Sequence, residues 1–313
     1  MLVNGEWARD FQPRHSTSEN GDFIREESRF RNWITADGSS GFKAEKGRYH
    51  LFAALICPWA SRTLMVRKLK RLDDVVSLTI LDPRVTEKVW RFGRFADSFP
   101  GSEADPLYGS HYLYEIYLRA KSDYTGEITV PVLWDKKLQT IVNNESSEII
   151  RMFNSGFGEL ADNSIDLYPS HFRAEIDHLN EQLYDRFNNG VYRAGFAESQ
   201  SAYESAVSNV FSTLDEINQL LEGQQYLIGN QLTETDIRTF VTLIRFEAAY
   251  YGLFKTNLHH LYEYPNIRRY VETIYHLPGI AETVNIEHIK AGYYSIKDLN
   301  PSGIVPVGPE SLW

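Results

Sequence analysis

The stretch Arg48-Tyr-His-Leu-Phe-Ala-Ala-Leu-Ile56, followed at once by Cys57-Pro58, decides the fold. Its apolar run predicts a strand that becomes buried towards its end. Pro58 suits the first turn of a helix, and apolar residues at helical spacing predict a helix over residues 60–72. A second apolar, β-branched run predicts a strand over residues 75–81. Strand, helix and strand in this order predict a βαβ unit of an α/β layer.

A second segment completes this layer. Thr129-Val-Pro-Val-Leu-Trp134 predicts a strand interrupted by Pro131. Residues 138–142 predict its hairpin partner, and Asn144-Glu145-Ser146 opens a predicted helix that runs to about Phe153. The residues between the two halves, 82–126, predict a long aromatic-rich insertion. The order of elements is therefore β-α-β followed by β-β-α.

The rest of the chain carries a helical pattern. Apolar residues recur at helical spacing over 176–187 and 207–221, and Thr233 to Asp236 resembles a capping box before a helix. Pro265 begins a further predicted helix that ends near His276. The predicted organisation is an irregular N-terminal extension (1–47), an α/β domain (48–155), an all-helical domain (165–290) and a Pro-rich C-terminal tail (291–313).

Composition excludes several classes of function. The net charge of −10 over 313 residues argues against a nucleic-acid partner, which requires a basic surface. We expect no membrane partner, because no apolar run approaches the length of a span. The first ten residues lack the pattern of a secretory signal, so a cytoplasmic location is expected. The single cysteine excludes an intramolecular disulfide and a cysteine-rich zinc site, and we expect no metal.

Cys57 is the candidate reactive group. A thiolate between a buried strand and a helix faces unpaired backbone N–H groups and the positive end of the helix dipole, and both stabilise the anion. A thiolate is the nucleophile in sulfur exchange. The residue three positions later is Ala60, so a small-molecule thiol must resolve any mixed disulfide. The alternative is a buried, inert cysteine, which position alone does not exclude.

Two further features suit a peptide-like ligand. A proline inside an apolar strand is out of place unless its backbone does something other than pair, which leaves the main chain of Val130 available; an edge strand is the alternative. Glu145 and Ser146 open a helix, where amide and hydroxyl groups bind carboxylates and a glutamate can pair with an ammonium. Both groups occur at the γ-glutamyl end of glutathione. The same two residues also suit a plain helix cap.

Five segments together resemble the glutathionyl-hydroquinone reductases, the Xi class of glutathione transferases. They are Cys57-Pro-Trp-Ala-Ser-Arg62, Thr129-Val-Pro-Val-Leu-Trp134, Ile141-Val-Asn-Asn-Glu-Ser-Ser-Glu-Ile-Ile-Arg151, Gly190-Val-Tyr-Arg-Ala-Gly-Phe196 and Asn300-Pro-Ser-Gly-Ile-Val-Pro306. The resemblance covers nearly the whole chain, including the extension and the tail. It implies a thioredoxin-like domain with Pro131 in the cis form, an all-helical glutathione-transferase domain and a homodimer.

The resemblance also implies a reaction and its residues. Cys57 attacks the thioether sulfur of a glutathionyl-hydroquinone, and a second glutathione then regenerates the thiolate. Glutathione is thus a co-substrate, and no permanently bound cofactor is expected. The implied glutathione contacts are Trp90, Val130, Glu145 and Ser146. The implied catalytic phenols are Tyr192 and Tyr293, and Tyr192, Tyr293 and Tyr294 are the implied lining of the hydroquinone pocket.

Two departures from the family pattern leave the preferred quinol open. Ser61 stands where the family usually has His, and Gly292-Tyr-Tyr-Ser-Ile-Lys297 is one residue shorter than usual. A broader monothiol thioltransferase, glutaredoxin-like or acting on dehydroascorbate, would use the same Cys57. A non-catalytic scaffold with the transferase fold would not need the cysteine, Val130-Pro131 and Glu145-Ser146 together, which argues against that alternative. A transferase that conjugates electrophiles usually activates glutathione with Tyr or Ser, so a catalytic cysteine argues against it as well.

Overall fold

The computed structural model describes residues 1–8, 16–18 and 20–312, which pack into two compact units. Unit 1 comprises residues 1–8, 26–165 and 283–292. Unit 2 comprises residues 16–18, 20–25, 166–282 and 293–312. Each unit is described by itself. Residues 16–18 and 20–25 of the extension thus belong to unit 2, and its other described residues belong to unit 1.

Unit 1 contains a four-stranded sheet with the order β10-β9-β7-β8. Its strands are β7 (Tyr49–Ala53), β8 (Val76–Ile80), β9 (Val132–Asp135) and β10 (Thr140–Asn143). β7 and β8 are parallel, whereas β9 is antiparallel to both β7 and β10. Every residue of β7 and β9 is buried, which is typical of central strands covered on both faces.

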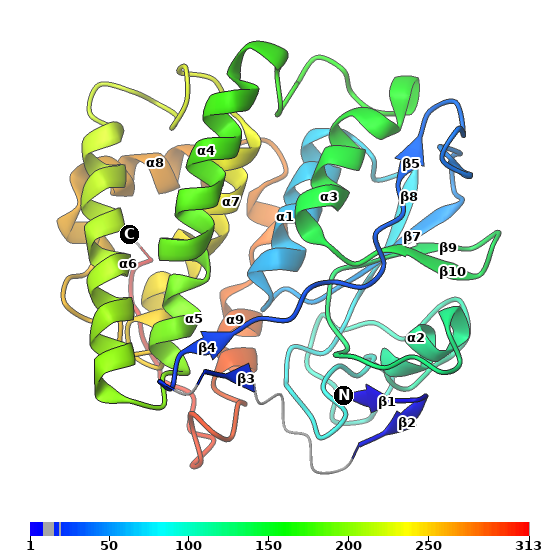
Figure 1. The fold of residues 1–313 in the computed structure, drawn as a ribbon, viewed down its shortest axis with the longest axis horizontal. Coiled ribbons are helices and arrows are strands. Elements are labelled where there is room, and N and C mark those ends of the chain that lie inside the picture. The colour runs from blue at the N-terminus through cyan, green and yellow to red at the C-terminus, as the bar shows by residue number, and fades with distance from the viewer. Residues whose placement is uncertain (9–15, 19, 313) are drawn as a thin grey trace. The chain divides into compact units, whose positions relative to one another are not determined.

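Helices cover this sheet. The helices of unit 1 are α1 (Pro58–Leu69), α2 (Tyr114–Ala120) and α3 (Ser146–Arg151), with the π-turn η1 (Met152–Gly156) and the 3₁₀ turn η2 (Gly158–Leu160). α1 packs against α3 and β7, and α2 contacts β10 (Figure 1). Two-residue pairs of strands complete the unit: β1 (Leu2–Val3) with β2 (Glu6–Trp7), and β5 (Ile34–Thr35) with β6 (Phe42–Lys43).

Asp135 determines where the hairpin between β9 and β10 turns. Its carboxylate accepts the N–H groups of Lys137 at 2.8 Å and Leu138 at 3.2 Å. Gln139 then takes a left-handed conformation with φ of 52°. β10 therefore begins at Thr140, two residues later than predicted, because the side chain of Asp135 closes a longer turn.

Unit 2 is helical apart from one short strand pair, β3 (Ser16–Thr17) with β4 (Phe23–Ile24). Its α-helices are α4 (Arg173–Leu183), α5 (Gly190–Gly195), α6 (Gln200–Leu220), α7 (Glu234–Arg245) and α8 (Pro265–Tyr275). The π-turns η4 (Tyr184–Asn188) and η5 (Phe246–Tyr250) extend α4 and α7. The 3₁₀ turns are η3 (Ser170–Phe172), η6 (Leu261–Glu263) and, at Ala281–Thr283, η7.

The predicted combination of an α/β layer and an all-helical part is confirmed. The capping box predicted at Thr233 is also present, with Asp236 accepting the Thr233 N–H at 2.8 Å. The last helix, α9 (Ile286–Tyr293), extends to Tyr293, so residues 291–293 are helical rather than part of the tail. In the described part of the chain, no helix is long and apolar enough to cross a membrane.

Asp236 makes the stability of unit 2 dependent on pH. Burial raises the pKa of this carboxyl to about 6, although Leu227, Thr233 and Tyr270 all donate hydrogen bonds to it. The unfolded carboxyl ionises near about pH 3.9. Raising the pH between these two values releases a proton only from the unfolded chain, so it favours unfolding.

We therefore expect the free energy of unfolding of the native protein, minus that of Asp236→Asn, to fall between about pH 4 and pH 6 and to stay constant above about pH 6. Urea unfolding of both proteins at a series of pH values measures this difference. Other titrating groups cancel in the subtraction. A difference that is flat or that rises between pH 4 and 6 contradicts the assignment.

Candidate active site

Three chain segments emerge at one end of the sheet in unit 1. The register pairs Phe52 near the end of β7 with Val132 at the start of β9, and Leu133 with Asn143 at the end of β10. Because β9 is antiparallel to both neighbours, the residues after β7, before β9 and after β10 leave the sheet on the same side. These residues include Cys57, Val130, Glu145 and Ser146.

Cys57 is the N-cap residue of α1, and Pro58 occupies the first helical position as predicted. The carbonyl of Cys57 accepts the first helical hydrogen bond from the Ser61 N–H at 2.9 Å. Its half-buried Sγ lies 3.5 Å from the carbonyl oxygen of Val130. The first amides of α1 and its dipole stabilise a thiolate at this position. The Val130–Pro131 peptide is cis, which confirms the hypothesis from the sequence.

Glu145 and Ser146 form the start of α3. Glu145 is the N-cap residue, and its Oε1 accepts the Ser147 N–H at 3.0 Å and the Ser147 hydroxyl at 2.8 Å. Burial raises the pKa of Glu145, but the bonds from Ser147 and Ser28 and the charge of Arg62 outweigh burial, so the pKa is lowered. A fixed negative charge therefore stands beside the first amides of α3. This pair of features suits a ligand that carries both an ammonium and a carboxylate.

Trp90 and Arg62 are the other large side chains of unit 1 that bear on the predicted site. Trp90 lies half-buried in the long insertion between β8 and α2, where its carbonyl accepts the Leu113 N–H at 3.0 Å. Arg62 is buried on α1, with its guanidinium 4.4 Å from the centre of the Trp59 ring. This stacking holds a positive charge on α1, the helix that Cys57 caps.

Unit 2 brings together two of the predicted phenols. The hydroxyl oxygens of Tyr192 on α5 and Tyr293 at the end of α9 lie 2.6 Å apart. The hydroxyl of Tyr250 lies 2.9 Å from that of Tyr293 and extends this contact into a chain of three phenols. Burial, with the neighbouring phenols, raises the pKa of Tyr250 and Tyr293 well above the ordinary value. Both therefore hold their protons at neutral pH.

The ring of Tyr192 is set in an aromatic wall. Phe23, Phe196 and Phe254 lie 5.4–6.3 Å from it between ring centres. The guanidinium of Arg25 lies 4.9 Å from the centre of the Tyr192 ring, and its Nε donates to the Asn189 side chain at 3.0 Å. Flat apolar walls with hydroxyl groups suit a phenolic ring.

Tyr294, the third predicted lining residue, has a different setting. It is half-buried, burial raises its pKa, and its carbonyl accepts the Asn300 side-chain N–H at 2.7 Å. Of the adjacent pair, Tyr293 is thus the residue whose hydroxyl contacts Tyr192. Among the residues that the structure describes, no group of three or more His, Cys, Asp or Glu side chains is placed to hold a metal ion.

The chain is similar to known proteins over nearly its whole length. The family models of the glutathione S-transferase N-terminal and C-terminal domains match residues 56–155 and 200–273. The chain is 49% identical to the glutathionyl-hydroquinone reductase YqjG of Escherichia coli K12, over 99% of this chain and 95% of the relative. It is 44% identical to the glutathionyl-hydroquinone reductase PcpF of Sphingobium chlorophenolicum, over 99% and 96%.

Solved structures give the same result. The glutathione transferase Xi of Phanerochaete chrysosporium superposes with a TM-score of 0.92 at 48% identity, over 96% of each chain. This chain belongs to the Xi class of glutathione transferases. The glutathione-bound structure of E. coli YqjG superposes on this Xi-class chain with a TM-score of 0.89 at 47% identity, over 99% of this chain and 96% of the other.

The sequence analysis of this Xi-class transferase missed Tyr250 and Ser28. The apolar pattern after Asp236 predicts a helix that ends at Ala249, but the π-turn η5 continues α7 and ends at Tyr250. Ser28 is an unremarkable residue of the polar extension, and only the folded chain shows its contact with Glu145. A π-turn changes the face of the helix on which the following side chains lie. The apolar periodicity of the sequence therefore does not predict where the Tyr250 hydroxyl points.

The three phenols make a prediction about coupling. The buried Tyr293 hydroxyl has Tyr192 and Tyr250 as neighbours, so either Tyr192→Phe or Tyr250→Phe leaves it one partner. We expect each single change to lower the free energy of unfolding by about 1 kcal/mol or less. The double variant strands the hydroxyl and should lose about 1–3 kcal/mol more than the sum.

Denaturant unfolding of the two single variants, the double variant and the triple variant with Tyr293→Phe tests this coupling. The triple variant should be more stable than the double variant, because no polar group then remains stranded. Additive losses in the double variant, or a further loss in the triple variant, contradict the proposed chain of hydroxyl contacts.

Proposed function

We propose that this Xi-class transferase is a glutathione-dependent reductase that converts glutathionyl-hydroquinones to hydroquinones. The observation that carries the proposal is the lone cysteine at the N-cap of α1, with its sulfur 3.5 Å from the Val130 carbonyl. Glu145 and Ser146 leave the sheet at the same end. The names of the relatives YqjG and PcpF support the same reaction in this chain.

The proposed glutathione site uses main-chain and charged groups of unit 1. The backbone of Val130 pairs with the cysteinyl residue of glutathione, which places the ligand sulfur beside Cys57. Glu145 pairs with the α-ammonium, and Ser146 with the first amides of α3 binds the α-carboxylate. Trp90 covers the ligand. The lowered pKa of Glu145 supports this role, because the carboxylate is ionised at neutral pH.

The first half of the reaction breaks a carbon–sulfur bond. The Cys57 thiolate attacks the thioether sulfur and forms a mixed disulfide with glutathione. The electron pair of the carbon–sulfur bond goes to the ring carbon, which takes up one proton and becomes the free hydroquinone. Two sulfur atoms are thereby oxidised to a disulfide, and the ring is reduced by the same two electrons.

The phenols of unit 2 are proposed to handle the charge on the ring. Breaking the bond leaves negative charge on the aromatic system, which Tyr192 and Tyr293 stabilise by hydrogen bonds or by donating the proton. Burial raises the pKa of Tyr293 further above its ordinary value, which favours the neutral hydroxyl that a hydrogen bond to the ring requires. Tyr294 completes the proposed hydroquinone pocket.

The second half regenerates the enzyme with a second glutathione. Its thiolate attacks the mixed disulfide, glutathione disulfide leaves, and the Cys57 thiolate returns. A small-molecule thiol is required because the chain has a single cysteine. Glutathione is thus a co-substrate, and the proposal includes no permanently bound cofactor and no metal. The homodimer and the cytoplasmic location that the class implies are also part of the proposal.

Replacement of the nucleophile tests the proposal. Native protein and Cys57→Ser are each given a glutathionyl-hydroquinone with excess glutathione, and free hydroquinone is measured. We expect turnover by the native protein and a loss of at least about 10³-fold in the variant, because oxygen at this position cannot form the mixed disulfide. Glutathione binding by both proteins shows that the variant is folded.

A second substrate distinguishes the reductase from a monothiol thioltransferase. A simple glutathione mixed disulfide is compared with the glutathionyl-hydroquinone at equal concentration. Preference for the glutathionyl-hydroquinone supports the reductase. Turnover of the mixed disulfide alone would replace it with a monothiol thioltransferase, and turnover of neither by a glutathione-binding native protein would exclude both.

A further inference from the structure

A buried amide connects both sides of the proposed glutathione site to the N-terminal extension. The Oδ1 of Asn144 accepts the Phe30 N–H at 3.1 Å, and its Nδ2 lies 3.2 Å from the Tyr117 hydroxyl and 3.3 Å from Thr129 Oγ1. Tyr117 in turn donates to the carbonyl of Thr129 at 2.9 Å. The side chain of Asn144, the residue before Glu145, is thereby connected to Thr129, the residue before Val130.

The extension lies along this edge of the sheet as an added strand-like segment. The Asn144 N–H donates to the Phe30 carbonyl at 3.1 Å, and the Asn32 N–H donates to the Val142 carbonyl at 3.0 Å. Arg31 forms an isolated β-bridge with Asn143. Residues 30–32 are therefore held by backbone hydrogen bonds rather than by side chains alone, which fixes the position of the residues just before them.

Ser28 reaches Glu145 from this anchored segment. Its Oγ lies 3.1 Å from Glu145 Oε2 and 3.3 Å from the Asn144 carbonyl oxygen. Ser147 holds the other carboxylate oxygen, Oε1, so one oxygen of Glu145 is bound from the N-terminal extension and the other from the first turn of α3. The hydroxyl of Ser28 has one hydrogen, and it serves the carboxylate and the carbonyl alternately.

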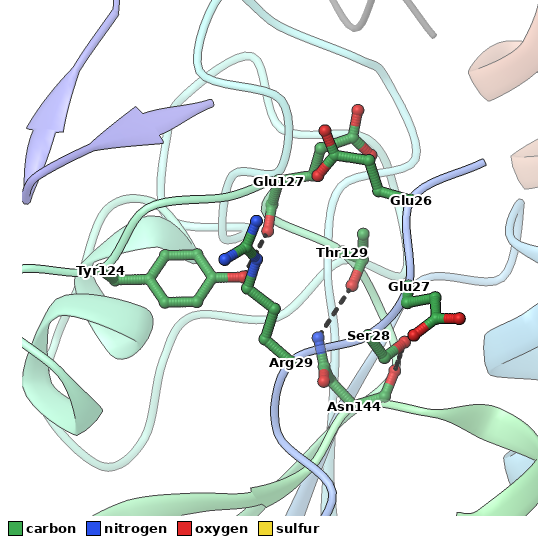
Figure 2. A pocket seen from close by; sticks show the side chains of 8 residues that line it. All are labelled: Glu26, Glu27, Ser28, Arg29, Tyr124, Glu127, Thr129 and Asn144. Carbon is green, nitrogen blue, oxygen red and sulfur yellow. Dashed lines mark hydrogen bonds between the residues drawn. The ribbon is translucent and has the colours of Figure 1, made fainter. Parts of the chain in front are cut away.

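The surroundings of Ser28 form an open hollow. It is lined by Glu26, Glu27, Ser28, Arg29, Tyr124, Glu127, Thr129 and Asn144 (Figure 2). Figure 2 shows the hydroxyl of Ser28 turned towards the Asn144 main chain and the Asn144 amide turned towards Thr129. Ser28 thus lines the hollow and also contacts the Glu145 carboxylate.

We propose that Ser28 is a positioning residue in the glutathione site. Its hydroxyl holds Oε2 of Glu145 in the orientation that binds the α-ammonium of glutathione. The inference rests on the proposed function and deepens it, because it makes residues 28–32 of the extension part of the glutathione site. An ionised carboxylate accepts about four hydrogen bonds, so Ser147, Ser28 and an ammonium bind it together.

The test measures binding of glutathione and of its analogue that lacks the α-amino group. Isothermal titration calorimetry is carried out on the full-length native protein and on Ser28→Ala. We expect Ser28→Ala to raise the Kd of glutathione by about 3- to 15-fold, and to leave the Kd of the analogue within about twofold. Turnover should show the same change as a raised KM for the glutathionyl-hydroquinone, whose glutathionyl part occupies this site, with kcat retained.

Matched variants separate positioning from a structural effect. Ser40→Ala removes another hydroxyl of the extension, whose partners Thr35 and Phe42 are local, and it should leave both Kd values unchanged. Ser28→Thr keeps the hydroxyl and should bind glutathione like the native protein. Ser28→Val has the shape of Ser28→Thr without the hydroxyl, so it should bind glutathione as weakly as Ser28→Ala. It also provides the comparison if Ser28→Ala does not fold.

Three results would overturn the inference. Equal losses for glutathione and the analogue would make Ser28 a purely structural residue. Unchanged glutathione binding in Ser28→Ala, with normal binding by the native protein, would exclude the role of Ser28 and leave the proposed function in place. Failure of the native protein itself to bind glutathione would remove the proposed function and this inference together.

Discussion

The pairing of β9 between β7 and β10 is the constraint on which the proposed thiol site depends. It places Cys57, Val130 and the start of α3 at one end of the sheet. A slip of one residue would turn every side chain of β9 to the other face and move the Val130 carbonyl by about 3.3 Å. The opposite end of the same strands is fixed by a buried ion pair, in which Arg48 beside β7 donates to the Asp135 carboxylate. The ion pair thereby fixes the strand register at the end of the sheet that lies away from Cys57.

The two units supply different chemistry. Unit 1 offers a thiol at a helix start and an ionised glutamate, which stabilise or bind charge. Unit 2 offers three phenols in contact, and burial raises the pKa of two of them, Tyr250 and Tyr293. This division matches the proposed reaction, since sulfur exchange needs a nucleophile and a bound peptide, whereas release of the ring needs hydrogen-bond donors. In both units the extension contributes a contact: Ser28 with Glu145, and Arg25 with the Tyr192 ring.

The parts of the structure that local patterns encode could be predicted from the sequence. The strand before Cys57, the helix after it and the capping box at Thr233 all depend on residues close together in the chain, whereas the cis form of Pro131 was implied by the resemblance. Tyr250 and Ser28 could not be predicted, because their partners Tyr293 and Glu145 are distant in sequence. The helix that begins after Glu145 also extends further than predicted, because the π-turn η1 continues α3 to Gly156. The functional roles of all the predicted site residues, Trp90 and Tyr294 among them, stay predictions.

The central claim is that Cys57 itself accepts the glutathionyl group from the thioether. Intact-protein mass spectrometry of a single turnover tests it most directly, with native protein and glutathionyl-hydroquinone mixed in the absence of free glutathione. The account predicts that one hydroquinone is released per chain while one glutathionyl group appears on the protein, located at Cys57 and removed by added glutathione. Release of hydroquinone with no adduct, or no release until free glutathione is present, would contradict it.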